Sequence, residues 1–141
     1  MYILYGGGVR RSVGPQMVLE EAGLPYELRT VDIAGGEHRS AAFLAINPAG
    51  YVPALITPEG DMLHEAAAIM VYLADRHELD DMAPRPGDLL RGRFYSRLFF
   101  LTNDIQPASK RSFYPERYTL DPADTDRVPA RSLWRMPKAV S

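Results

Sequence analysis

The feature that most constrains this chain is a turn-rich loop followed by two short apolar runs and the start of a helix. The loop at residues 47–51 contains an Asn-Pro pair and a glycine, which are typical of tight turns. Val52-Pro53 then places a proline at the first residue of an apolar run, where its missing N–H breaks no strand pairing. After a polar turn, Glu65 opens an alanine-rich segment with a carboxylate, which favours a helix start. This stretch predicts a loop, a two-stranded hairpin and a helix.

The segment before this loop predicts two strands, each followed by a helix. Residues 2–5 form an apolar run that ends at three glycines, as expected of a buried strand and a turn. Apolar residues at helical spacing predict a helix over residues 13–22, and residues 26–33 alternate as a strand does. A short helix capped by Ser40 follows. With strands at 53–57 and 62–64 and a helix at 65–76, the order is β-α-β-α-β-β-α, a mixed α/β (α+β) arrangement of the thioredoxin-like type.

A second part of the chain is expected after a short linker. Residues 79–87 contain two prolines and no hydrophobic period, which is typical of a linker. Apolar and aromatic residues then recur at helical spacing and predict one long amphipathic helix over residues 88–103. From Pro107 onward, recurring prolines predict a mostly irregular tail. We therefore expect a thioredoxin-like domain at 1–78, a linker at 79–87, and a partial all-α domain with an irregular tail at 88–141.

Composition excludes several classes of function. The chain has no cysteine, which removes disulfides, thiolate metal sites and cysteine nucleophiles. Its formal net charge of −2, with acids and bases interspersed, argues against nucleic acid and anionic membranes as partners. The histidines lack the spacing of metal ligands, so no metal is expected. No apolar run is long enough to span a bilayer and the first residues lack a signal sequence, which predicts a cytoplasmic protein.

The loop, hairpin and helix start closely resemble the glutathione-binding signature of the glutathione S-transferase family. That signature runs Asn-Pro-x-Gly-x-Val-Pro-Ala-Leu and then Leu-x-Glu-Ser-x-Ala-Ile. The chain meets every position except the serine, which is Ala66. Residues 19–26 are also similar to the end of the first helix in bacterial members. The resemblance covers about residues 2–77 and implies a thioredoxin-like glutathione-binding domain with a cis bond between Val52 and Pro53.

The resemblance also implies which residues contact glutathione. The main chain of Val52, held by Pro53, pairs with the peptide backbone of glutathione, and Glu65 binds the γ-glutamyl ammonium. Ala66 retains its N–H for the γ-glutamyl carboxylate but lacks the hydroxyl, a loss that lowers affinity about ten- to a hundredfold. Each residue also has a purely structural interpretation: a proline in a tight turn, or a carboxylate that complements the helix dipole. Arg11 is a further candidate for the carboxylates of glutathione, or lies in solvent.

Catalysis in this family depends on a donor that stabilises the thiolate of glutathione. The resemblance places two candidate hydroxyls, those of Tyr5 and Ser12, near the end of the first strand. A core aromatic at Tyr5 and a helix cap at Ser12 are equally good explanations of these residues.

We therefore expect a glutathione S-transferase-like protein that binds glutathione as a cosubstrate and conjugates its thiolate to a small electrophile. In complete family members the helix at 88–103 lies partly at a two-fold interface, so a homodimer is expected. One alternative is a non-catalytic glutathione-binding or protein-interaction module derived from a transferase by truncation. Another is a non-functional fragment of a longer gene. Residues 129–141 resemble nothing in the family.

Overall fold

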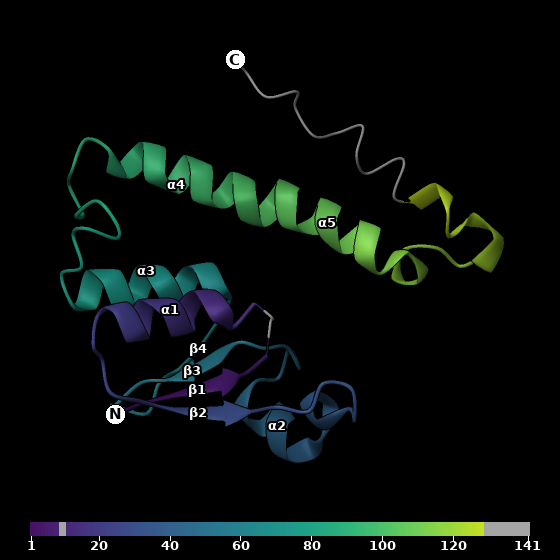
Figure 1. Ribbon diagram of the computed structural model, residues 1–141, viewed down its shortest axis with the longest axis horizontal. Coiled ribbons are helices and arrows are strands. Elements are labelled where there is room, and N and C mark those ends of the chain that lie inside the picture. Colours follow the sequence, from purple (N-terminus) through teal and green to yellow (C-terminus); the bar gives the residue numbers. More distant parts are fainter. Residues whose placement is uncertain (9–10, 129–141) are drawn as a thin grey trace. The chain divides into compact units, whose positions relative to one another are not determined.

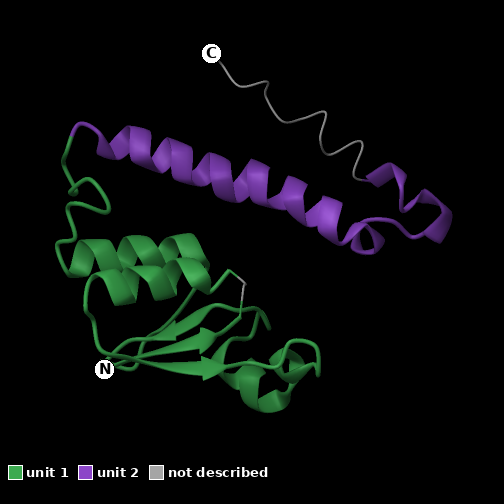
Figure 2. Ribbon diagram, viewed as in Figure 1, with its two compact units in different colours: residues 1–88 green, residues 89–141 purple. Residues whose placement is uncertain are grey.

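The computed structural model describes residues 1–8 and 11–128 of the 141-residue chain. It divides into two compact units, Met1–Asp88 and Leu89–Ser141, which are coloured separately in Figure 2. The last part of the expected irregular tail, residues 129–141, lies outside the described residues. Each unit is considered by itself below.

The first unit is built on a four-stranded sheet with the strand order β2-β1-β3-β4 (Figure 1). β1 (Tyr2–Gly6) pairs in parallel with β2 (Tyr26–Thr30), and α1 (Val13–Glu21) supplies the crossover that a parallel pair requires. β1 also pairs antiparallel with β3 (Ala54–Ile56), which forms an antiparallel hairpin with β4 (Met62–His64). This mixed sheet confirms the predicted thioredoxin-like fold.

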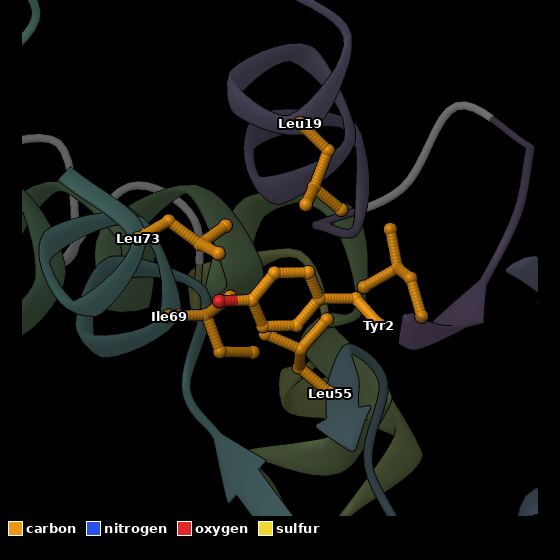
Figure 3. Packing of buried hydrophobic residues seen from close by; sticks show 6 residues of the cluster. Tyr2, Leu19, Leu55, Ile69 and Leu73 are labelled. Atoms are coloured by element: carbon orange, nitrogen blue, oxygen red, sulfur yellow. The ribbon is translucent and has the colours of Figure 1, made fainter. Parts of the chain in front are cut away.

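Two helices and one face of the sheet enclose the main core. Leu19 of α1 and Ile69 and Leu73 of α3 (Ala66–Arg76) are fully buried, and they pack on side chains from β1 and β3 (Figure 3). Burying one such side chain stabilises the fold by about 1.5–3 kcal/mol. The packing therefore fixes α1 and α3 against the sheet, and with them Ser12 and Glu65, which directly precede these two helices.

A second cluster lies on the other face of the sheet. Successive side chains of a strand point to opposite faces, so Tyr5 faces away from the core that contains its neighbour Leu4. Tyr5 packs with Val31 and with Phe43 of α2 (Ala41–Ile46). The hydroxyl of Ser40 caps α2, because it accepts the N–H of Phe43 at 3.2 Å, as the sequence predicted.

Most predicted elements of this unit are present, with shifted ends. β3 begins at Ala54 because Pro53 has no N–H to give to the sheet. β2 ends at Thr30, short of the predicted residue 33. A 3-10 helix, η1 (Glu37–Arg39), follows between β2 and α2.

The second unit contains more helix than the sequence predicted. The helix expected to end at residue 103 continues without interruption to Phe113, and short 3-10 helices follow it. Pro107 lies inside this continuous helix, directly after a π-helical turn, and such a turn is one way in which a helix accommodates a residue that has no N–H to donate. Along the described part of the chain, no helix combines the length and apolar character needed to cross a membrane. The elements are α4 (Arg91–Phe100), the π-helical η2 (Leu101–Ile105), α5 (Gln106–Phe113), η3 (Pro115–Arg117) and η4 (Pro122–Asp124).

Candidate functional site

Three segments of the first unit meet at one edge of the sheet. Tyr5 of β1 and His64 of β4 both lie opposite Ala54 of β3 in the two antiparallel ladders. The residues that follow Tyr5, follow His64 and precede Ala54 therefore emerge at the same edge. The register thus brings together the segments that the sequence analysis singled out, namely Gly6–Gly8, Val52-Pro53 and Glu65-Ala66.

The segment that leads into β3 is held by a buried polar residue. Val52 and Pro53 are joined by a cis peptide bond, which confirms the bond that the family resemblance implied. Ahead of them, Asn47 is only 1% exposed. Its Nδ2 donates to the carbonyl of Tyr51 at 2.8 Å and its Oδ1 accepts the N–H of Ala49 at 3.2 Å. The Asn47 side chain therefore fixes the main chain of the loop that leads into β3.

Glu65 has an unusual backbone at the N-terminus of α3. Its φ is 67° and its ψ is 113°, and a residue with a side chain adopts such a conformation at a cost of about 1–3 kcal/mol. The strain points to a local requirement, because a helix start does not need it. Its side chain is exposed and makes no capping bond to the helix. The Glu65 carboxylate therefore lies beside the first N–H groups of α3 without capping them. The first N–H groups of a helix have no intrahelical partner and favour anions.

Ser12 lies directly before α1 and is fully buried. It does not cap the helix through its side chain. Instead, its Oγ accepts the N–H of Gly7 at 3.0 Å, which leaves its own proton available for donation. A Cβ on Gly6 would lie 2.3 Å from the Cβ of Ser12, so only glycine fits there. Gly6 and Gly7 therefore pack closely against the Ser12 hydroxyl.

Tyr5 lies in a different environment from Ser12. Its ring packs edge-on against Phe43, with centroids 6.0 Å apart, and its hydroxyl accepts a hydrogen bond from Nη1 of Arg29 at 2.9 Å. The carboxylate of Glu27, followed by the Tyr5 hydroxyl, raises the pKa of Arg29 above its usual value. The Tyr5 hydroxyl is thus held beside β2, whereas that of Ser12 lies against Gly6, at the edge where the three segments meet.

The remaining candidates are less constrained. Arg11 is exposed immediately before Ser12, and the neighbouring arginine at position 10 lies outside the described residues. Among the described side chains, no group of three His, Asp or Glu residues is arranged to hold a metal ion. Sequence reasoning assigned Asn47 to a turn and missed its burial and its bonds. The available signal was a polar side chain directly after an apolar helix.

A family model supports the assignment of this unit. The model for the glutathione S-transferase N-terminal domain matches residues 12–76, from Ser12 to the end of α3. The matched residues belong to the glutathione S-transferase family. A maleylacetoacetate isomerase from Pseudomonas aeruginosa is 44% identical over 64 residues, which cover 44% of this chain and 30% of that protein. Human glutathione S-transferase theta-2 is 45% identical over 60 residues, 42% of this chain and 24% of its own length.

One relative extends the similarity into the second unit of the chain. The uncharacterized GST-like protein YncG of Escherichia coli K12 is 31% identical over 124 residues, 86% of this chain and 58% of its own length. The chain thus spans between 24% and 58% of these three curated relatives.

Solved structures of the family show the same fold. A glutathione transferase homolog from Sulfitobacter, solved with bound glutathione, superposes with a TM-score of 0.82 at 28% identity, over 94% of this chain and 63% of that one. A sphingomonad glutathione S-transferase in complex with glutathione gives a TM-score of 0.75 at 33% identity, over 94% of this chain and 64% of that one. These neighbours cover both the site edge and the helical segment of the second unit.

Proposed function

We propose that this protein binds glutathione at the sheet edge where Val52, Glu65 and Ala66 emerge. The observation that carries the proposal is the strand register, which brings Val52-Pro53 and Glu65-Ala66 of the glutathione signature to one edge together with the end of β1. The two solved relatives with glutathione in their structures support the same ligand. A γ-glutamyl group carries an ammonium and a carboxylate side by side, and this edge offers a carboxylate beside a helix N-terminus.

Each polar group of glutathione has a partner in this proposal. The carboxylate of Glu65 binds the γ-glutamyl ammonium, and the N–H of Ala66 with the α3 N-terminus binds the γ-glutamyl carboxylate. The main chain of Val52, held in place by Pro53, pairs with the peptide groups of the cysteinyl residue. Arg11 attracts the carboxylates of the peptide from the exposed end of the loop after β1.

We extend the proposal to conjugation of glutathione to a small electrophile. The thiol of glutathione loses its proton to solvent, the thiolate sulfur forms a bond to an electrophilic carbon, and the leaving group departs with the electron pair of the broken bond. A hydroxyl that donates to sulfur favours the thiolate. Ser12 is the first candidate because its proton is not used by Gly7, and Tyr5 is the second. Because Ser12 is buried, its contact with sulfur requires a local rearrangement around this hydroxyl.

A second candidate function is non-catalytic binding, either of glutathione alone or within a protein-interaction module. One observation favours it: the hydroxyl of Tyr5 is held by Arg29 and that of Ser12 is enclosed. Neither is presented to a thiol at the sheet edge. The two functions share the glutathione site and differ only in the fate of the thiol.

The organisation of the whole chain is part of the proposal. We assign glutathione binding to residues 1–78, a connecting role to 79–87, and association into a homodimer to the truncated helical domain at 88–141. The compact unit that ends at Asp88 and the exposed aromatic side chains of α4 support this division. A glutathione-dependent protein fits the cytoplasm, where glutathione keeps thiols reduced.

Calorimetric titration with glutathione tests the binding site. The parent should bind with micromolar to millimolar affinity, and Glu65→Ala should bind at least about tenfold more weakly because a charge-assisted bond is lost. Glu59→Ala is the matched control, since Glu59 is an exposed acid that pairs with Arg76 and lies in the turn at the other end of the β3–β4 hairpin. Equal affinities of Glu65→Ala and the parent would show that the site is wrongly assigned.

A further inference from the structure

Asn47 is buried at the end of α2, and hydrogen bonds to the following loop occupy both ends of its side chain. Its own N–H donates to the carbonyl of Phe43 at 2.8 Å and completes the last turn of the helix. Its side chain donates to the carbonyl of Tyr51 at 2.8 Å and accepts the N–H of Ala49 at 3.2 Å. Its carbonyl accepts the N–H of Gly50 at 2.9 Å. One residue therefore holds three successive main-chain groups of the loop.

The bond to Tyr51 fixes the direction of the next N–H along the chain. The carbonyl of Tyr51 and the N–H of Val52 belong to one planar trans peptide unit, in which they point in opposite directions. Because Asn47 holds the Tyr51 carbonyl toward the end of α2, the N–H of Val52 points away from α2. Within residues 1–8 and 11–128, that N–H forms no main-chain hydrogen bond. It is therefore available to a ligand.

The other side of the loop is fixed by close packing at Gly50. Its φ of +64° is one that glycine adopts readily. A Cβ at this position would lie 3.1 Å from the carbonyl oxygen of His38 and 3.2 Å from Cδ2 of Leu44. The loop is thus pressed against η1 and α2, and Asn47 acts on a segment with little freedom to move.

We infer that Asn47 is a positioning residue, which aims the N–H of Val52 at the cysteinyl peptide carbonyl of glutathione without touching the ligand. The inference rests on the proposed function, since that function makes Val52 a ligand contact. Asparagine suits this position because one side chain must donate to a carbonyl and accept from an N–H. Aspartate keeps the shape and the acceptor but loses the donor to Tyr51, and alanine loses both.

The experiment compares Asn47→Ala and Asn47→Asp with the matched control Thr57→Ala. Thr57 is also buried and also bonds a main-chain N–H, that of Asp61 at 3.2 Å, but at the other end of the hairpin. Glutathione affinity is measured by calorimetry, and stability by denaturant unfolding. The direction of the Val52 N–H is measured without ligand, from its residual dipolar coupling in partially aligned samples.

Both Asn47 variants should bind glutathione about tenfold more weakly, which corresponds to one lost hydrogen bond, and should show a changed Val52 coupling. Thr57→Ala should lose stability yet keep the parent's affinity. If Asn47→Ala fails to fold, Asn47→Asp gives the result. Variants that bind as tightly as a binding parent overturn the inference. If the parent itself does not bind, the proposed function fails, and the coupling alone then decides: an unchanged value in the variants overturns the positioning role as well.

Discussion

The hydroxyl of Tyr5 accepts a hydrogen bond from Nη1 of Arg29 at 2.9 Å, across the parallel pair of β1 and β2. The same guanidinium lies 5.6 Å from the centre of the Tyr5 ring and forms an ion pair with Glu27 at 2.8 Å. The bond from Arg29 occupies one lone pair of the Tyr5 hydroxyl oxygen and holds the Tyr5 side chain in place. This arrangement distinguishes Tyr5 from Ser12, the other hydroxyl at the end of β1.

The first prediction therefore separates the two hydroxyls by their effect on catalysis. We expect Ser12→Ala to lower the rate of glutathione conjugation to a chloronitrobenzene by at least about tenfold, and Tyr5→Phe to lower it by less than about threefold. Ser12→Ala also leaves the buried N–H of Gly7 unpaired, at a cost of about 1–3 kcal/mol. Denaturant unfolding must therefore show that each variant is folded in the assay.

Three other results are informative. A larger loss in Tyr5→Phe than in Ser12→Ala would assign the thiol donor to Tyr5. Rates that are unchanged in both variants would exclude both hydroxyls. A parent that binds glutathione but does not conjugate it would favour the non-catalytic module.

The elements that the sequence predicted are those specified by local patterns. The order of strands and helices in the first unit follows from apolar periodicity and from turn residues. Both of these patterns are contained in segments of about ten residues. The cis bond before Pro53 followed from the resemblance to the family. The continuation of the helix through Pro107 was missed because the local pattern does not show the π-helical turn that precedes this proline.

The contacts that the sequence could not predict depend on register and burial. Tyr5 meets Arg29, 24 residues further on, only because β1 and β2 pair in one particular register. Asn47 and Ala49 are close in sequence, yet the role of Asn47 depends on its burial beneath the loop. Local propensity describes Asn-Pro as a turn, and it contains no information on which main-chain groups the side chain will hold.

The second prediction concerns the missing hydroxyl at the first residue of α3. Ala66→Ser should tighten glutathione binding by about ten- to a hundredfold, because the new hydroxyl can donate to the γ-glutamyl carboxylate beside the helix N-terminus. Ala68→Ser, which adds a hydroxyl at an exposed position in the same helical turn, should leave the affinity unchanged. Calorimetric titration measures both. An Ala66→Ser variant with the parent's affinity would show that the carboxylate does not lie at this helix terminus.

The third prediction concerns stability at high pH. Burial, with a further contribution from nearby Tyr72, raises the pKa of Tyr2 above its ordinary value of 10.0. The unfolded state therefore loses this proton at a lower pH than the folded state does, so Tyr2 stabilises the fold below pH 10.0 and this contribution is lost as the pH rises further. Tyr2→Phe also removes a 2.7 Å hydrogen bond to Nε2 of His77, at a cost of about 1 kcal/mol near neutral pH.

Denaturant unfolding of the parent and of Tyr2→Phe across this pH range measures the effect. The free energy of unfolding of the parent should fall more steeply above pH 10.0 than that of the variant, so the difference between them should shrink. Parallel curves for the two proteins would show that Tyr2 titrates alike in the folded and unfolded states.

The last prediction concerns the exposed aromatic side chains of α4. Tyr95 and Phe99 stack one helical turn apart, with centroids 6.1 Å apart, and Phe99 is 57% exposed. Phe100 and Leu101 beside them are also exposed. Leaving such groups in water forfeits about 25 cal/mol for each Å² of apolar surface, which self-association would recover. We therefore expect a dimer whose population rises with protein concentration in light scattering.

Phe99→Asp should shift this equilibrium toward the monomer, because a carboxylate in an apolar interface must be desolvated without a partner. Leu120→Asp is the control, since Leu120 is fully exposed outside the α4–α5 helix and its replacement should leave the dimer intact. An equal loss of dimer in both variants would indicate a general effect of added charge. A parent that remains monomeric at high concentration and binds no hydrophobic dye would show that the apolar side chains of α4 are covered within a single chain.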